Sequence, residues 1–478
     1  MIALFPTTLL VSSLAASAAS VELNPGDDVA ALTASLTAGD EIVFYAGTYP
    51  IAEAIEWTGA GTEAAPITLR ASGGAVVLDF SGSYEVVYLH DAAYIDIDGI
   101  TFAPGATNKN NPYALYLENA DHVSITNCRF GPAGKGVYLN GDNTALTFDH
   151  NEVLGTTDNH GVYVGCSDAS CWTQDSSFTN NWIHDVGGEY SYLFYLANGG
   201  QNNLILDNVL YGTDYRGMAV NSTEYGDPNL VQGNAIWNTG ESGLLVRGPS
   251  LVQNNVVFNT GRYGIYTGDN DRATLTNAVI SHNTVYDTAD YALYMESWSG
   301  REGMVLANNA LCNTTGYGLG IADGGVDDQA YLAHNVVSGL VTRLEQYAGN
   351  DTPVIPGGGD GDFLDPESWN FYPSNGSSLV HAADPASAAW VPETDFNGAP
   401  RNGDAPDAGA YERSGETNPG WLFQEGFKTV GDLAEDSPDV VGGCCKGKGG
   451  GTESALFAPF MLLALRCARS RARRQAAG

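Results

Sequence analysis

One short sequence pattern recurs along most of the chain and limits what the chain can fold into. Its clearest copy is residues 254–266, NNVVFNTGRYGIY, where an Asn pair precedes aliphatic residues, an Asn-Thr-Gly turn and a second short apolar strand. A single copy is too small to bury its apolar side chains, so copies must stack on one another. We therefore expect one elongated repetitive body rather than several globular domains.

The spacing of the repeated Asn residues predicts the architecture. The members of the series are Asn127, Asn151, Asn181, Asn208, Asn234, Asn255, Asn283, Asn309 and Asn335. Successive members lie 21 to 30 positions apart, with short strands between them. A drifting period in the twenties is typical of the coils of a parallel β-helix, whereas propeller blades need roughly 40 residues. Leucine-rich repeats need a Leu-x-x-Leu-x-Leu framework, which is absent. The predicted fold class is therefore all-β.

The Asn position has a physical role in such a stack, because the same turn recurs about 4.8 Å above itself. An Asn side chain can hydrogen-bond along the stack, and Asn tolerates the left-handed backbone of a corner. Asp98 is predicted to hold the same position one turn before Asn127. The residues two positions after each Asn form an inward aliphatic series: Val153, Ile183, Leu210, Ile236, Val257, Val285, Leu311 and Val337. Arg129 interrupts this series in the first coil.

A second strand in each copy predicts a row of aromatic side chains on the outside. Alternation places Val137, Val162 and Phe194 inward. The outward positions are then Tyr116, Tyr138, Tyr163, Tyr195, Tyr266 and Tyr294, interrupted by Ala219, Leu245 and Gly320. The rings could form subsites for sugar units, since their flat apolar faces suit sugar C–H groups. They could equally stabilise the helix by stacking on one another.

The Asn coils and strands such as HGVYV resemble the right-handed parallel β-helix superfamily of pectate lyases, alginate and chondroitin lyases, and epimerases. The resemblance covers residues 20–412 and implies a single-domain right-handed parallel β-helix with N- and C-terminal caps. Within it, residues 360–412 resemble the closing coil and cap of secreted β-helix proteins. The fold hosts many activities, so this likeness implies little about function.

Titratable residues collect at one predicted corner, just before the tyrosine strands. Lys135 and His160 should lie one rung apart, and His160 and Arg216 two rungs apart. A polysaccharide lyase or epimerase needs a base and a group that neutralises the uronate carboxylate. The permitted assignment is His160 or Lys135 as base, Arg216 or Arg247 as neutralising group, Tyr163 as acid, and Asp158 as the residue orienting the imidazole. A corner His can also simply hydrogen-bond a turn.

The strongly negative net charge limits which partners the protein can bind. The formal net charge is −36, and seven of the 20 Lys and Arg residues lie in the last 35 positions. Such a body repels nucleic acids and anionic lipid surfaces. Calcium is a possible cofactor, and Asp269 and Asp271 in GDNDRAT are its candidate ligands, although loops of this composition also form plain turns. No other cofactor is expected.

The two ends of the chain predict export. Residues 1–19 have an apolar centre and an Ala-Ser-Ala end, as in a secretory signal peptide. Residues 413–443 are expected to form an acidic linker, and residues 444–478 place a short apolar run before a basic cluster. This tail resembles myxobacterial C-terminal sorting signals, which implies display at the cell surface of a Gram-negative bacterium or release. Any membrane contact would be through this tail. Cys166 and Cys171, in one loop, could form a disulfide.

Two functions remain open from the sequence. The first is a carbohydrate-active protein, a polysaccharide lyase, epimerase or glycoside hydrolase, which binds or processes extracellular polysaccharide along the outer strand face. The second is a non-catalytic structural or adhesion module at the cell surface. The paired Asp motifs of polygalacturonases and the Asp-Pro-His-Glu signature of mannuronan epimerases are absent. A monomer is expected.

Overall fold

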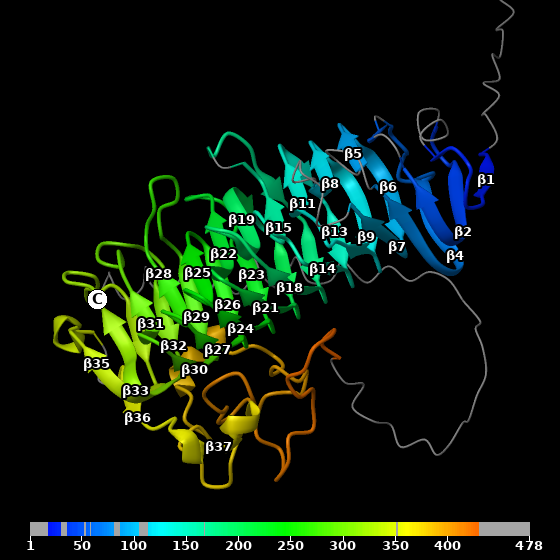
Figure 1. Cartoon of the computed structure of the whole chain (residues 1–478). Coiled ribbons are helices and arrows are strands. Elements are labelled where there is room, and N and C mark those ends of the chain that lie inside the picture. The colour runs from blue at the N-terminus through cyan, green and yellow to red at the C-terminus, as the bar shows by residue number, and fades with distance from the viewer. Residues whose placement is uncertain are drawn as a thin grey trace, which may run out of the picture.

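The computed structural model describes residues 18–29, 36–51, 54–57, 59–80, 87–104, 113–166, 168–349 and 352–429. The expected sorting segment and almost all of the expected signal peptide lie outside these ranges. Within them the chain winds into one parallel β-helix of about 11 turns (Figure 1). The prediction of an all-β, single-domain parallel β-helix is confirmed.

Each turn contributes strands to three columns, in which strands of successive turns pair in parallel. The tyrosine column contains β3 (Ile55–Trp57), β5 (Val87–His90), β8 (Tyr113–Glu118), β11 (Lys135–Asn140), β15 (Val162–Val164), β19 (Tyr192–Gln201), β22 (Arg216–Ser222), β25 (Leu244–Arg247), β28 (Ile265–Thr267) and β31 (Tyr291–Met295). The middle column contains β1 (Ser20–Leu23), β6 (Ala93–Asp98), β9 (Asp121–Thr126), β12 (Asn143–Thr144), β13 (Thr147–Asp149), β16 (Thr173–Gln174), β17 (Ser177–Thr179), β20 (Leu204–Leu206), β23 (Asn229–Gln232), β26 (Ser250–Gln253), β29 (Ala278–Ser281), β32 (Val305–Ala307) and β34 (Tyr331–Ala333).

The third column, called the covered column below, follows the repeated Asn residues. It contains β7 (Ile100–Ala103), β10 (Arg129–Phe130), β14 (Glu152–Leu154), β18 (Trp182–Val186), β21 (Val209–Thr213), β24 (Ala235–Thr239), β27 (Val256–Thr260), β30 (Thr284–Thr288) and β36 (Val354–Pro356). Longer strands turn a corner: β2 (Glu41–Pro50) and β4 (Ile67–Asp79) join the middle and covered columns. Likewise β33 (Ala310–Ile321) and β35 (Asn335–Thr342) join the covered and tyrosine columns.

The inward side chains of all three columns form one continuous core along the axis. Val137 pairs with Val162 and Val162 with Phe194, and each is at most 2 % exposed. Full burial of one such side chain contributes about 1.5–3 kcal/mol. The alternation expected for these strands is therefore present and supplies the main apolar stabilisation.

An Asn ladder runs through the corner between the middle and covered columns. It consists of Asn151, Asn181, Asn208, Asn234, Asn255, Asn283, Asn309 and Asn335. Each of the first seven side-chain amides donates to the next Asn Oδ1 at 2.8–3.2 Å. Each Oδ1 after the first also accepts the backbone N–H of the preceding Asn. Such a chain satisfies buried polar groups that would otherwise be costly.

The left-handed backbone expected at the ladder Asn lies one residue earlier. His150, Asn180 and Asn254, for example, have φ of 52–53°. Asn127 has φ 53° and belongs to this left-handed series, so Cys128 occupies the first ladder position and donates its N–H to Asn151 Oδ1. Phe130 then points inward and Arg129 outward, which removes the apparent interruption of the inward series.

The position predicted for Asp98 was also wrong. Asp98 pairs with Thr126, two residues before Cys128, so it lies outside the ladder. Its carboxylate accepts hydrogen bonds from Thr126 Oγ1 and Asn127 Nδ2. Ladder and left-handed positions both tolerate Asn, which explains why spacing alone placed the first turns out of register.

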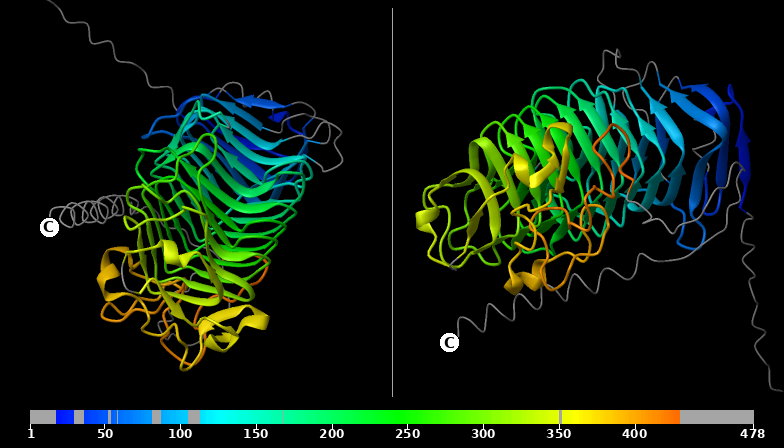
Figure 2. Two further views of the ribbon diagram at one scale, coloured as in Figure 1. Left: turned by 90° about the vertical axis from the view of Figure 1, so that its left-hand side faces the viewer. Right: turned by 90° about the horizontal axis from the view of Figure 1, so that it is seen from below.

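Residues 357–429, called the C-terminal segment, do not close the end of the stack. They fold back along the side of the helix over β21, β24, β27 and β30 (Figures 1 and 2). The segment contains η2 (Asp360–Asp362), β37 (Phe363–Asp365), η3 (Pro366–Ser368), β38 (Asn370–Pro373) and η4 (Pro385–Trp390). The closing cap expected for residues 360–412 is therefore a lateral cover. The last turn is instead closed by η1 (Leu344–Gln346) and Tyr347, which pack on the core.

The docking of the C-terminal segment continues beyond residue 412. Trp421 is buried, and the fully buried Lys428 Nζ pairs with Asp207 at 2.6 Å and donates to the carbonyl of Gly233. Arg401 is also buried and donates to Asn254 Oδ1. The packing of residues 413–429 thus differs from the linker expected for residues 413–443.

Candidate functional site

The predicted tyrosine register is present on the outside of the tyrosine column. Tyr116 pairs with Tyr138, Tyr138 with Tyr163 and Tyr163 with Tyr195. The rings of Tyr138 and Tyr163 stack with centroids 5.0 Å apart. Further along, Tyr266 pairs with Tyr294. The spacing follows from the repeat because each turn places the same position about 4.8 Å above the last.

A small gap divides this tyrosine row. Ala219 and Leu245 follow Tyr195 in register and leave no ring of their own. The neighbouring rings of Tyr192 and Tyr266 pack on Ala219 and Leu245, which are both at most 1 % exposed. The row therefore consists of a longer N-terminal part and a shorter C-terminal part.

An open groove of about 590 Å³ lies over the N-terminal part of the row. Its tyrosines are Tyr113, Tyr116, Tyr138 and Tyr163. Its other lining residues are Glu118, Asn119, Asn140, Gly141, Asp142, Cys166, Asp168, Ser170 and Cys171. Carboxylates and aromatic rings thus line one concave surface without a Lys or Arg among the described lining residues.

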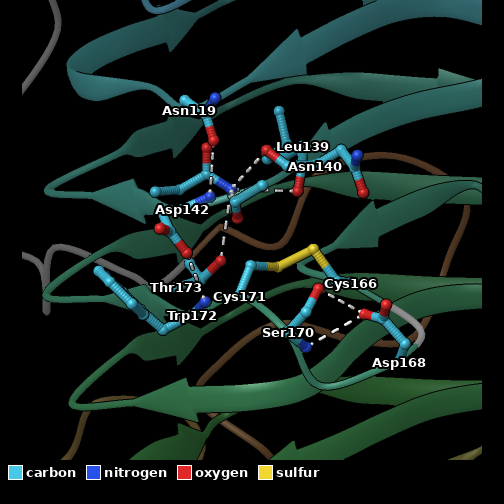
Figure 3. The surroundings of a disulfide bond; sticks show 12 residues. Asn119, Leu139, Asn140, Asp142, Cys166, Asp168, Ser170, Cys171, Trp172 and Thr173 are labelled. Carbon is cyan, nitrogen blue, oxygen red and sulfur yellow. Dashed lines mark hydrogen bonds between the residues drawn. A yellow bond between two sulfur atoms is a disulfide. The ribbon is translucent and has the colours of Figure 1, made fainter.

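One wall of the groove is formed by Cys166, Asp168, Ser170 and Cys171, which are held by contacts at both ends of this stretch (Figure 3). Cys166 and Cys171 form a disulfide with their Cα atoms 5.7 Å apart. Asp168 Oδ1 accepts hydrogen bonds from the N–H and the hydroxyl of Ser170. The N–H of Trp172, directly after the loop, donates to Asp142 Oδ1 at 3.1 Å. These contacts give the wall a defined position.

The three corner residues share one side of the tyrosine column, as the spacing predicted. Lys135 pairs with Tyr113, the carbonyl of His160 accepts the N–H of Gly136, and Arg216 pairs with Tyr192. Lys135 Nζ lies 4.5 Å from the centroid of the Tyr113 ring and donates to its hydroxyl at 3.2 Å. Lys135 thus lies at the rim of the groove, on one of its tyrosines.

His160 is enclosed by aromatic rings. Its centroid lies 5.3–6.2 Å from those of Tyr138, Tyr163, Tyr192 and Tyr195. Nδ1 accepts the N–H of Tyr192 at 3.1 Å, so the neutral ring carries its proton on Nε2. Burial lowers the pKa of His160 to about 4. With its basic nitrogen engaged, the imidazole is poorly placed to take a proton from a ligand.

Of the other predicted catalytic residues that the structure describes, Arg216 is bound to protein groups and Asp158 is not hydrogen-bonded to His160. Arg216 pairs with Glu241 through two guanidinium nitrogens and donates to Tyr192 Oη at 2.8 Å. Burial opposes the charge of Arg216, but the hydrogen bonds and charge interactions with Glu241 and Tyr192 together outweigh burial and raise the pKa of Arg216. In the described part of the chain the exposed Asp158 makes no hydrogen bond to His160. The orienting role expected for Asp158 is therefore contradicted.

Arg247 and Tyr163 are the remaining two predicted catalytic residues. Arg247 is 9 % exposed and donates to Asn221 Oδ1 at 3.3 Å, with its guanidinium 5.9 Å from the Tyr266 ring. Tyr163 is 7 % exposed, and its ring packs against His160. The structure therefore brings the predicted catalytic residues onto one face without arranging a free base beside a free cation.

The expected calcium ligands are not gathered into a site. Asp269 pairs with Arg301 at 2.7 Å, and its other oxygen accepts the N–H of Leu275. Asp271 is exposed. Across the described ranges, no group of three or more His, Cys, Asp or Glu side chains is arranged to hold a metal ion.

Two functional features were missed by sequence reasoning. The first is the set of groove carboxylates, Glu118, Asp142 and Asp168. Glu118 lies two positions after Tyr116, so the alternation that exposes the tyrosine also exposes the carboxylate. The second is another aromatic row three positions after the ladder Asn: His184, Tyr211, Trp237, Phe258 and Tyr286. The recurring aromatic at this position was a detectable signal.

Comparisons with known proteins agree with the fold. A family model described as "right handed beta helix region" matches residues 67–225 and 170–337, together more than half of the chain. No curated protein sequence matches significantly. In the part of the chain that the structure describes, no helix is both long and apolar enough to cross a bilayer.

Several solved structures have a similar path of the chain. Pectate lyase Pel9A is 15 % identical with a TM-score of 0.47, and the match covers 84 % of this chain and 97 % of that one. A mannuronic acid specific family 6 lyase from human gut microbiota is 17 % identical with a TM-score of 0.42, over 64 % and 85 % of the two chains. The Dettilon tailspike protein is 14 % identical with a TM-score of 0.41, over 59 % and 62 %.

Proposed function

The chain belongs to the right-handed β-helix family, and we propose that this member binds an extracellular polysaccharide along its tyrosine column without cleaving it. The groove over Tyr116, Tyr138 and Tyr163 is the central binding site. Binding sites for small ligands and chain segments are typically concave, aromatic and supplied with a few polar groups. This groove combines those properties on a rigid strand scaffold.

The observation that carries the proposal is the in-register row of rings beneath an open groove. Tyr116, Tyr138 and Tyr163 occupy the same position in three successive turns. Their stacked rings offer apolar surface to sugar C–H groups, while Asn140 and the groove carboxylates supply hydrogen-bond partners for hydroxyls. A groove that crosses several turns suits a chain rather than a single sugar.

The contacts that His160 and Arg216 make within the protein favour a binding function over catalysis. His160 Nδ1 accepts a backbone N–H, and Arg216 is paired with Glu241. A lyase or epimerase needs a free base and a free cation beside the same sugar ring. Both groups are committed to protein partners, so a binding or adhesion module accounts better for this arrangement than an enzyme does.

We further propose that the protein is exported and displayed at the cell surface. The apolar residues 1–19 and the apolar-basic tail 444–478 support this proposal. The Cys166–Cys171 disulfide supports it independently, since structural disulfides persist mainly in oxidising compartments. Fractionation of the native host with an antibody against the β-helix would test it, and recovery of the protein in the cytosol alone would contradict it.

A glycan-binding screen tests the central proposal. The purified full chain is titrated with soluble neutral and charged polysaccharides by affinity electrophoresis and calorimetry. Tyr116→Ala should weaken binding about tenfold, the usual effect of removing an aromatic anchor. Tyr294→Ala is the matched control because Tyr294 occupies the same register position outside the groove.

Two results would overturn the proposal. Equal binding by the Tyr116→Ala and Tyr294→Ala variants would remove the groove as the site. Release of unsaturated products or reducing ends, abolished by His160→Ala, would show that the protein is an enzyme.

A further inference from the structure

Three carboxylates, Glu118, Asp142 and Asp168, are among the described lining residues of the groove. Asp142 Oδ1 accepts the N–H of Trp172, and Asp168 accepts the N–H and hydroxyl of Ser170. These donors are neutral. Glu118 accepts the hydroxyl of Tyr88 and has His90 Nε2 at 3.5 Å. The described lining residues include no Lys or Arg, so the groove has a negative potential of its own.

The tyrosine floor adds an attraction for cations. The face of an aromatic ring carries negative potential, and an ammonium group is stabilised within about 6 Å of its centroid. The protein already uses this contact at the rim, where Lys135 Nζ lies 4.5 Å from the Tyr113 centroid and donates to the hydroxyl. An ammonium group on a ligand would find the same ring and hydroxyl chemistry along the floor.

A uronate chain would meet the opposite conditions. Its carboxylates would lie beside Glu118, Asp142 and Asp168. Among the described cations, Lys135 is engaged with Tyr113 and Arg216 is paired with Glu241, while the charge of Arg272 acts on Asp168. Like charges held a few ångströms apart repel, and solvent exposure reduces this repulsion without reversing it. The charge pattern thus discriminates between sugars of similar size and shape.

From this combination we infer that the groove selects polysaccharides with free amino groups, whose sugars carry an ammonium at neutral pH. The inference rests on the proposed glycan-binding function and specifies its ligand class. The aromatic floor supplies the contact with the sugar ring, and the carboxylates supply the preference for a positive charge. N-acetylation removes that charge while leaving the sugar ring unchanged.

The test compares three oligosaccharides of equal length on the full chain: a glucosamine hexamer, its N-acetylated counterpart and a galacturonate hexamer. Calorimetry should show the tightest binding for the glucosamine hexamer, with an affinity that falls as salt rises. Asp142→Asn and Asp168→Asn should each weaken that binding, up to about fivefold, as expected for solvent-exposed ion pairs. Binding of the N-acetylated hexamer should weaken less in these variants, because that ligand carries no ammonium group.

Asp328→Asn is the matched control, since Asp328 is exposed and lies outside the groove. Equal affinity for the glucosamine and N-acetylated hexamers, with both lost in Tyr116→Ala, would overturn the inference and leave the proposed function standing. Binding of the galacturonate hexamer in the presence of calcium, lost in Asp142→Asn, would also overturn it, because the carboxylates would then hold a metal ion. Binding of none of the three would count against both.

Discussion

Two outer faces of this β-helix carry stacked aromatic rows, yet one is covered and the other open. On the covered column, the centroid of Trp237 lies 4.6 Å from that of Tyr211 and 5.6 Å from that of Phe258. The C-terminal segment packs Trp369, Phe371 and Phe423 onto Phe258, with centroids 5.0–5.3 Å apart. On the tyrosine column no comparable segment of the described chain covers Tyr116 and its neighbours, which line an open groove.

The difference shows that stacking by itself does not identify a binding face. Both rows arise from the same periodicity, and both stabilise successive turns. The covered row contains Trp and Phe, whose large apolar side chains contribute the most stabilising free energy when they are buried. The open row is tyrosine, whose hydroxyls accept hydrogen bonds, as Tyr116 does from Asn140 and Tyr195 from Asn221. Hydroxyl groups allow the open row to remain at the surface.

The largest expected effect is a difference between the two rows in how much their residues contribute to the free energy of unfolding. Phe258→Ala should lower the free energy of unfolding by about 3–5 kcal/mol, because it opens a cavity between the helix and the C-terminal segment. Tyr294→Ala on the open row should lower it by about 1 kcal/mol. Urea unfolding followed by tryptophan fluorescence measures both. Equal losses would mean that the covered row is no better packed than the open one.

The pH dependence of stability provides a second contrast through His160 on the tyrosine column. Its folded pKa of about 4 lies below the unfolded value of about 6.5, so the folded state binds fewer protons. The stability is therefore fully present above pH 6.5 and falls as the pH drops towards 4, by up to about 3 kcal/mol. His160→Gln should flatten this dependence in urea titrations at pH 4.5 and 7.5. An unchanged slope would exclude a buried neutral imidazole.

The wall of the open groove gives a third, smaller effect. Replacing both Cys166 and Cys171 with Ser removes a link between residues that lie five positions apart. The free energy of unfolding should fall by about 2 kcal/mol or less. Glycan affinity should fall as well, because the wall loses its defined position. Reduction of the wild-type protein should reproduce both changes, and full glycan affinity after reduction would show that the wall is unnecessary.

The smallest effect concerns His184, the first member of the covered row. Burial opposes the charge of His184, but its contacts with Glu152 and Asp185 outweigh burial and raise its pKa. The stability that it contributes is thus present below the unfolded pKa of about 6.5 and is lost as the pH rises through the folded value. His184→Gln should weaken the protein more at pH 6 than at pH 9, a trend opposite to that of His160. A larger loss at pH 9 would contradict the ion-pair assignment.

Much of the site was predictable because its parts follow from local periodicity. The repeat placed Tyr116, Tyr138 and Tyr163 in one row and put Lys135 and His160 on neighbouring turns. The partners of these residues were not predictable. Tyr192 N–H on His160 and Glu241 on Arg216 come from adjacent turns, and their contacts depend on side-chain conformations that spacing does not encode.

The repeat alone was enough to predict the architecture, because a period in the twenties with alternating apolar residues can bury its core only as a stack of coils. It also determined the outward tyrosine row, since alternation follows from strand geometry. Only the tertiary structure decided which aromatic face remained open. That choice depends on the docking of residues 357–429 onto much earlier turns, as in the Lys428–Asp207 pair, whose members lie 221 positions apart. Contacts at such separation leave no periodic signal, because they depend on the surface that the finished helix presents.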